Sequence, residues 1–408
     1  MKLSILLQKL TCTLLIVIAS FFVQCVSAQS FVSSEYPDRI TLTISKDPVR
    51  TQTVTWRTDS SVLTSKAQVC LDNGTPIQNA AIREIAAATK TLKGKDGRTD
   101  LYHHVVFDQL EPAHVYAYRV GDGEHWSEWF QFRTASNDTE PFSFIYLGDA
   151  QNDIKSEWSR VIRQSFRQQP DARFIIHAGD LINNANTDTE WGEWHYGAGF
   201  IHAMIPVFPT PGNHEQGGRD SLNRPTLDPH WTTQFTLPDN GPEEAVYYVD
   251  YQGVRIISLN SQTMGKDPQA LDSQAKWLED VLKNNPMKWT VITLHHPMYT
   301  TAKRRESEDM QVKERLKALY DQYGVDLVLQ GHDHTYARGK GPNAVAKGPV
   351  YMLSVAGPKM YVSDSDRWMD VALEKTQLYQ TITVTSGKLV VKAYKASGEL
   401  FDSFELTK

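Results

Sequence analysis

Residues 142–149 have the sequence FSFIYLGD, an apolar run that ends in a glycine and a carboxylate. A helical spacing of apolar residues follows this run, and the same order of strand and helix recurs further along the chain. The expected strand and helix pairs lie at 142–147 and 154–168, 174–176 and 189–204, 254–259 and 268–284, and 289–294 and 309–322. Strands that alternate with helices predict an α/β domain with its sheet strands at the centre.

The residues before this domain have a different pattern. Apolar and polar residues alternate at 40–44 and again at 101–107, 114–120 and 128–133, and Asp, Gly, Ser and Pro separate the runs. Alternation with a period of two predicts antiparallel strands, and a span of roughly 100 residues is typical of a β-sandwich. The predicted fold class is therefore an all-β N-terminal sandwich followed by an α/β (α+β) domain.

Strand patterns return near the C-terminus, at 350–355, 380–385 and 389–394. The pattern of apolar and polar residues changes near residue 136, where the alternating runs end and the strand and helix pairs begin. We therefore expect three parts, which are a leader at 1–28, a β-sandwich at 29–136 and an α/β domain at 137–408.

The leader has the order of features found in secretory signal peptides. Lys2 and Lys9 supply positive charge, residues 14–23 are almost unbroken apolar sequence, and Val26-Ser27-Ala28 offers small residues for cleavage. The apolar run is shorter than the roughly 20 residues that a membrane-spanning helix needs. We expect a cleaved signal peptide, a secreted or periplasmic protein, and no transmembrane segment in the mature chain.

Composition excludes some classes of partner. The 408-residue chain has a formal net charge of −6, and loss of the two leader lysines makes the mature chain more acidic. A mildly acidic protein offers no electrostatic attraction for nucleic acid as its main partner. Cys12 and Cys25 leave with the leader, so Cys70 has no intrachain disulfide partner and the core must stabilise the fold.

Candidate ligand residues gather where the predicted α/β strands end. Ligands of open α/β sheets bind outside the carboxyl ends of the strands, so side chains that follow several strands converge on one crevice. Carboxylate, amide and imidazole groups together suit Mn, Fe, Zn or Ni. The motifs are Gly148-Asp149, Gly179-Asp180, Gly212-Asn213-His214-Glu215, His295-His296-Pro297 and Gly331-His332-Asp333-His334.

The order of these five motifs resembles that of the calcineurin-type metallophosphoesterase superfamily, and more narrowly that of the purple acid phosphatases. Residues 37–43 and 53–56 resemble the fibronectin type III-like domain that precedes the catalytic domain of those phosphatases. The resemblance covers nearly the whole mature chain. It implies a metallophosphoesterase domain with a β-sandwich core flanked by helices.

The resemblance also implies which residues bind two metal ions, expected to be Fe, Zn or Mn. Asp149 and His334 match the ligands of the first ion. Asn213, His295 and His332 match those of the second ion, and Asp180 matches the carboxylate that bridges both. A bridging carboxylate suits the separation of roughly 3.5–4 Å between the cations of two-metal hydrolases.

The chemistry implied is hydrolysis of a small phosphate ester by a metal-bound hydroxide. Asp180 would hold both cations, and His214 matches the histidine that stabilises the transition state or protonates the leaving oxygen. The closer resemblance favours acid-phosphatase-like hydrolysis of phosphomonoesters. The alternatives are a phosphodiesterase or nucleotide pyrophosphatase on the same centre, and a non-catalytic protein that binds a surface glycan or another protein.

Two positions depart from the purple acid phosphatase pattern. Asn183 stands where those enzymes have the tyrosine that ligates ferric iron and gives their colour, so we expect a colourless protein. Gln151 stands where other members of the superfamily have a metal-binding histidine. Both are candidates for completing the first metal's ligands or for lining the pocket. Arg304 and Arg305 are candidates for binding substrate phosphate, although a basic run is also typical of a solvated surface.

Overall fold

The computed structural model describes residues 31–302, 310–341, 344–345, 348–363 and 368–408. The predicted signal peptide, 1–28, lies outside these residues. Residues 33–408 form one compact unit. None of the helices in the described part of the chain has both the length and the apolar character needed to cross a membrane.

The N-terminal part is a β-sandwich, as its alternating pattern predicts. One layer has the strand order β4-β3-β7-β8, and the other is the β1-β2-β6-β5 part of a longer sheet. Leu42, Trp56, Phe107, Tyr118 and Phe132 pack between the layers. The strands are β1 (Asp38–Thr43), β2 (Gln52–Asp59), β3 (Lys66–Leu71), β4 (Arg83–Ala86), β5 (Ala88–Lys93), β6 (Thr99–Phe107), β7 (Val115–Gly121) and β8 (Phe130–Arg133), with a 3₁₀ turn, η1 (Ile77–Asn79).

The longer sheet continues from the sandwich into the α/β part without a break. Its ten strands have the order β23-β22-β21-β9-β10-β11-β1-β2-β6-β5. Strand β1 pairs in parallel with β11 through Thr43 and Val207, and the Ile44 N–H donates to the Val207 carbonyl at 2.9 Å. The added strands are β9 (Phe142–Leu147), β10 (Ile175–Ala178), β11 (Val207–Thr210), β21 (Leu378–Val384), β22 (Lys388–Lys395) and β23 (Leu400–Thr407).

A second sheet packs against this one. Its order is β14-β15-β16-β17-β19-β18-β20, and β15, β16, β17 and β19 are parallel neighbours. Tyr146 and Ile176 of the first sheet meet Tyr247, Ile256 and Leu329 of the second in one buried cluster. The strands are β14 (Tyr247–Tyr251), β15 (Val254–Leu259), β16 (Trp289–Leu294), β17 (Leu327–Gln330), β18 (Tyr336–Gly339), β19 (Val350–Leu353) and β20 (Val371–Leu373).

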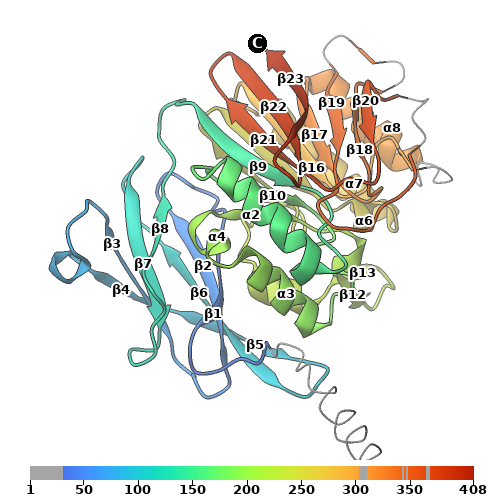
Figure 1. The fold of residues 1–408 in the computed structure, drawn as a ribbon. Coiled ribbons are helices and arrows are strands. Elements are labelled where there is room, and N and C mark those ends of the chain that lie inside the picture. The colour runs from blue at the N-terminus through green and yellow to red at the C-terminus, as the bar shows by residue number, and fades with distance from the viewer. Residues whose placement is uncertain (1–30, 303–309, 342–343, 346–347, 364–367) are drawn as a thin grey trace, which may run out of the picture. The chain divides into compact units, whose positions relative to one another are not determined.

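Helices cover the outer face of each sheet, which completes the predicted layered architecture. Trp158 and Trp194 pack on Ile145 and Ile175 of the first sheet, and the green helices lie over β9 and β10 in Figure 1. Another cluster joins helices to the outer face of the second sheet. The helices are η2 (Ile154–Trp158), α2 (Ser159–Gln168), α3 (Asp188–Ala198), α4 (Phe200–Met204), α5 (Pro229–Gln234), α6 (Ser261–Met264), α7 (Pro268–Lys283) and α8 (Met310–Tyr323).

Local sequence explains where these helices begin and end. Helix α7 begins at Pro268, and the side chain of Asp267 caps it by accepting a hydrogen bond from the Gln269 N–H. The helical pattern expected at 189–204 is divided at Gly199, whose φ of 54° a residue with a side chain adopts with difficulty. The long pattern therefore folds as two helices, α3 and α4.

Candidate metal centre

The predicted ligand residues all follow parallel strands. Asp149 follows β9, Asp180 follows β10, and a 3₁₀ turn after β11, η3 (Asn213–Glu215), carries Asn213 and His214. His295 follows β16 in the second sheet, and the segment after β17 carries the last two histidines. The carboxyl ends of parallel strands meet at one edge of a sheet, so two packed sheets bring these side chains together.

The ligand atoms form two groups that share one carboxylate. Atoms of Asp149, Asp180 and His334 lie within 4.8 Å of one another, and so do atoms of Asp180, His295 and His332. The first group is buried, whereas His332 in the second group is half-buried. Asp180 thus lies between the groups, where a bridging ligand has to lie.

The spacing within the second group suits a bound cation. Ligands at about 2.1 Å from one metal and at 90° to 110° to each other lie roughly 3.0–3.4 Å apart. His295 Nε2 is 3.0 Å from Asp180 Oδ2 and 3.3 Å from His332 Nδ1. Asn213 Oδ1 is 3.0 Å from His332 Nδ1. The four side chains therefore lie at the distances that ligands of one ion require.

Backbone carbonyls fix the orientation of two of the imidazoles. His295 Nδ1 donates to the Ala178 carbonyl at 2.9 Å, and His334 Nδ1 donates to the Lys359 carbonyl at 2.9 Å. Each bond leaves the Nε2 lone pair directed at the carboxylates. The tautomer that can bind a metal is therefore set by the backbone.

His214 stands beside the groups and is not a member of either. Its N–H donates to Asp180 Oδ1 at 2.9 Å, and its Nδ1 donates to the Asn183 carbonyl at 2.5 Å. Its Nε2 is 3.9 Å from Asp180 Oδ2, and 26% of the side chain is exposed. The imidazole is thus held at the open side of the cluster, where a substrate can reach it.

Strained backbone accompanies the ligands. Asp180, His332 and His334 have φ values of 52°, 74° and 47°, a left-handed conformation that is uncommon for residues with a side chain. Such strain persists only where the surrounding structure enforces it, and it gathers at functional sites.

Comparison with known proteins agrees with this geometry. The sequence profile of the calcineurin-like phosphoesterases matches residues 142–336. The profile of the purple acid phosphatase N-terminal domain matches residues 37–134. The chain belongs to the purple acid phosphatase-like metallophosphoesterases. It is thus a phosphatase-type hydrolase, and this family has a centre of two metal ions.

Proteins with similar sequences or structures are named as acid phosphatases or purple acid phosphatases. Acid phosphatase type 7 of Mus musculus is 28% identical over 359 residues, which cover 78% of this chain and 77% of the mouse protein. Probable purple acid phosphatase 20 of Arabidopsis thaliana is 29% identical over 273 residues, which cover 61% of each protein. The structure of a purple acid phosphatase from yellow lupin seeds superposes with a TM-score of 0.78 at 19% identity, covering 92% of this chain and 75% of that one. The last comparison confirms the fold.

The electrostatics of this phosphatase favour positive charge at the cluster. Burial raises the pKa of Asp149, and the neighbouring Asp180 adds to that increase. Burial also opposes ionisation of Asp180, but His295 and His214 outweigh it and lower its pKa. Although burial opposes its charge, the two carboxylates raise the pKa of His295 to about 10. Carboxylates that attract a proton so strongly to a buried imidazole also favour a metal cation.

Glu215 also lies at the site, although the sequence pattern assigns it no role. It is fully buried, its Oε2 accepts from the N–H groups of Gly212 and Asp180, and its Oε1 accepts from that of Leu181. It therefore ties the Asp180 turn to the turn that precedes Asn213. Its place in the Gly212–Glu215 motif was the available signal, but a motif alone does not reveal contacts with backbone amides.

The remaining candidates differ in their surroundings. Gln151 is buried in contact with Asp180 and His334. Asn183 hydrogen-bonds through its backbone, accepting from His214 and donating to Glu190 Oε2 at 2.6 Å. The predicted phosphate-binding residues Arg304 and Arg305 lie outside the described residues.

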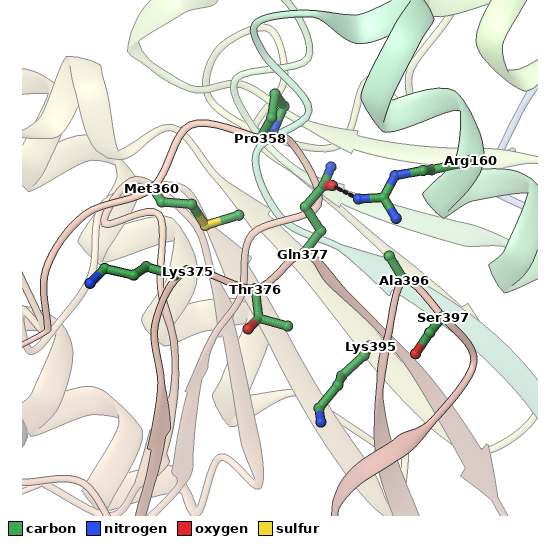
Figure 2. Close-up of a pocket in the computed structure, with 9 residues that line it drawn as sticks. All are labelled: Arg160, Pro358, Met360, Lys375, Thr376, Gln377, Lys395, Ala396 and Ser397. Carbon is green, nitrogen blue, oxygen red and sulfur yellow. Dashed lines mark hydrogen bonds between the residues drawn. The ribbon is translucent and has the colours of Figure 1, made fainter.

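A cavity of about 340 Å³ lies beside the loop that supports the first ligand group (Figure 2). Pro358 and Met360 line it, and they flank the residue whose carbonyl orients His334. The basic residues Arg160, Lys375 and Lys395 also line the cavity. Each is within 3.6 Å of a glutamate oxygen, at Glu157, Glu374 and Glu399 respectively. None of the residues that line this cavity belongs to either ligand group.

Proposed function

We propose that this chain is an exported phosphatase that hydrolyses small phosphomonoesters, in the manner of an acid phosphatase, at a centre of two metal ions. The sharing of Asp180 between two ligand groups is the observation that carries the proposal. We further propose that residues 1–28 are a signal peptide, 29–136 a fibronectin type III-like sandwich and 137–408 the catalytic domain. Nucleic acid is not expected as the main partner.

The proposed ligands follow from the groups. Asp149, Asp180 and His334 would hold the first ion. Asp180, with Asn213, His295 and His332, would hold the second. The mixture of carboxylate, amide and imidazole donors suits Fe, Zn or Mn. When bound, two such ions supply a water nucleophile of lowered pKa and neutralise charge on the phosphoryl oxygens.

The protein's own contribution is orientation and proton transfer. Asp180 receives the His214 N–H on Oδ1, so the bridging carboxylate and the catalytic histidine are positioned together. His214 donates Nδ1–H to the Asn183 carbonyl, which leaves Nε2 directed toward the open side. From there, a protonated Nε2 can donate to the leaving oxygen or stabilise charge on the phosphoryl group.

Turnover of an aryl phosphomonoester and an aryl phosphodiester tests this function. The wild-type protein, loaded in turn with Fe, Zn and Mn, is compared with Asn213→Ala and His214→Ala. We expect the monoester to be the faster substrate. Loss of an acid or base group lowers kcat by roughly 100- to 10,000-fold, so we expect that loss for His214→Ala.

The alternatives predict different results. Faster turnover of the diester would support the phosphodiesterase alternative and contradict the monoester preference. If the wild type and both variants were equally inactive with every metal, the non-catalytic binding protein would be supported instead.

A further inference from the structure

The side chain of Gln151 ends between two members of the first ligand group. It lies in the turn after β9, two residues beyond Asp149, and is fully buried. Its amide Nε2 is 3.1 Å from Asp180 Oδ2 and 3.0 Å from His334 Nε2. The terminal amide is therefore directed at the two atoms that face the first ion in the proposed centre.

These two distances equal the spacing of ligands around one ion. Neighbouring ligands of a metal lie roughly 3.0–3.4 Å apart. In the second group, His295 Nε2 lies 3.0 Å from the same oxygen, Asp180 Oδ2, so this oxygen has a neighbour at ligand spacing in each group. The inner end of the Gln151 amide thus lies where one more ligand of the first ion would lie.

The two ends of an amide exchange places when its terminal bond rotates by 180°, and the surroundings decide which end faces inward. The outer end, Oε1, is buried and has no hydrogen-bond partner among the described residues. The inner end faces a carboxylate oxygen and the lone pair of His334, whose Nδ1 donates to the Lys359 carbonyl. A cation at this point reverses the preference, because Oε1 can then coordinate it.

Asn183 does not have this geometry. Among the described residues, its hydrogen bonds are made by backbone atoms, with Glu190 and His214 as partners. The residue in the position of the phenolate therefore orients the catalytic histidine instead of reaching the first group.

We propose that Gln151 binds the first metal ion through Oε1, in place of the missing phenolate. The inference rests on the proposed two-metal centre. An amide oxygen is neutral, whereas a phenolate is an anion, so this first site has one negative charge fewer than a site with tyrosine. The first site therefore favours a divalent ion over ferric iron.

Calorimetric titration of metal-free protein with Mn²⁺ tests the inference without measuring activity. The variants are Gln151→Leu, which has no donor, Gln151→Glu, which restores an oxygen donor, and Asn183→Leu as the matched control. We expect Asn183→Leu to bind two ions, each with the affinity that the wild type shows. Gln151→Leu should bind one of the two ions at least tenfold more weakly, and Gln151→Glu should bind both ions at least as tightly as the wild type. Thermal unfolding of each metal-free variant is measured alongside.

Each other outcome has a defined meaning. Two ions bound by Gln151→Leu with wild-type affinities would overturn the ligand assignment and leave the two-metal function standing. Equal weakening of both ions, with a lower unfolding temperature of the metal-free variant, would show a packing role and also overturn it. Fewer than two ions bound by the wild type would contradict the proposed centre itself.

Discussion

The carboxylate of Glu215 accepts three backbone hydrogen bonds, at 2.6 Å from Gly212, 2.9 Å from Asp180 and 2.8 Å from Leu181. Burial and the neighbouring Asp180 raise its pKa, while the amide donors favour the ionised form. Asp180 has a left-handed backbone, so it needs support of this kind. Glu215 therefore holds in place the backbone turn that carries Asp180.

Replacing Glu215 by Gln should destabilise the protein by roughly 2–3 kcal/mol, because the new NH₂ group faces backbone N–H donors and leaves at least one of them without an acceptor. Urea unfolding in the presence of a chelator measures this change without any contribution from metal. Glu399→Gln is the control, since Glu399 is exposed and pairs with Lys395 across a turn, and exposed pairs contribute less than about 1 kcal/mol. Equal unfolding midpoints for the two variants would refute the role of Glu215.

Ferric protein should show no visible tyrosinate band, because Asn183 offers no phenolate. The absorption spectrum of protein loaded with ferric iron checks this. Tyr361 is the residue to examine if a band appears, since its ring centroid lies 4.6 Å from that of His334. A band that disappears in Tyr361→Phe would show that another tyrosine ligates the iron, and the prediction would be wrong.

The sequence predicts the candidate metal ligands better than it predicts the residues that hold them in position. Asp149, Asp180 and His295 each follow an apolar strand, so their convergence is expected from strand ends alone. Glu215 is different, because its partners are backbone amides of two turns and no side-chain pattern records them. The choice between Gln151 and other candidates likewise depends on three-dimensional distances.

At the scale of elements, the turns after the strands leave no space for extra atoms. A Cβ on Gly212 would lie 2.1 Å from Asp180 Oδ1, and one on Gly331 would lie 2.6 Å from Asp149 Oδ2. Both distances are far below van der Waals contact. Only glycine fits at these two positions, because the carboxylates of Asp180 and Asp149 pack directly on their α-carbons.

Gly212→Ala should weaken metal binding at least tenfold and destabilise the protein by about 1–3 kcal/mol, the usual effect of overpacking. Gly387→Ala is the matched control, because a Cβ there meets no atom within 4 Å and Gly387 has no positive φ. Metal titration and thermal unfolding of both variants make the comparison. Wild-type binding by Gly212→Ala would mean that the Asp180 turn can move aside.

Element prediction succeeds where the pattern is local. The helix expected at 268–284 is α7, Pro268–Lys283, whose cap and amphipathic spacing lie in adjacent residues. Strand β23, Leu400–Thr407, was not predicted, because it lies at the sheet edge and its residues are mostly exposed or half-buried. The pairing of β1 with β11 was not predicted either, since the two strands are far apart in the chain and no local pattern marks their contact.

At the scale of the whole molecule, a buried ion pair and the hydrogen bonds that follow it join the sandwich to His214. Arg39 donates to both carboxylate oxygens of Asp188, at 2.7 and 2.9 Å. Asp188 begins helix α3, and Glu190 in the same helix accepts from the Asn183 N–H at 2.6 Å. The Asn183 carbonyl in turn orients His214. This connection supports the view that the sandwich braces the catalytic part.

Arg39→Met should therefore destabilise the protein by about 3 kcal/mol at neutral pH, because it leaves a buried carboxylate with one partner fewer. It should also lower kcat through the displaced His214, with little change in KM. Arg83→Met is the control, since Arg83 pairs with Asp108 at the exposed surface, where such pairs contribute less than about 1 kcal/mol.

The pH dependence of stability distinguishes an effect of the Arg39 charge on Asp188 from an effect of side-chain packing alone. Burial opposes ionisation of Asp188, but Arg39 outweighs it, so the pKa of Asp188 in the folded protein lies below its ordinary value. A lowered pKa stabilises the fold above the ordinary value of about 3.9, and that stabilisation is lost as the pH falls toward the folded value. The free energies of urea unfolding of wild type and Arg39→Met should therefore show their full difference between about pH 5 and pH 7. The difference should be smaller below about pH 4. A difference that stays constant down to pH 3 would mean that Arg39 acts by packing alone, and not through its charge.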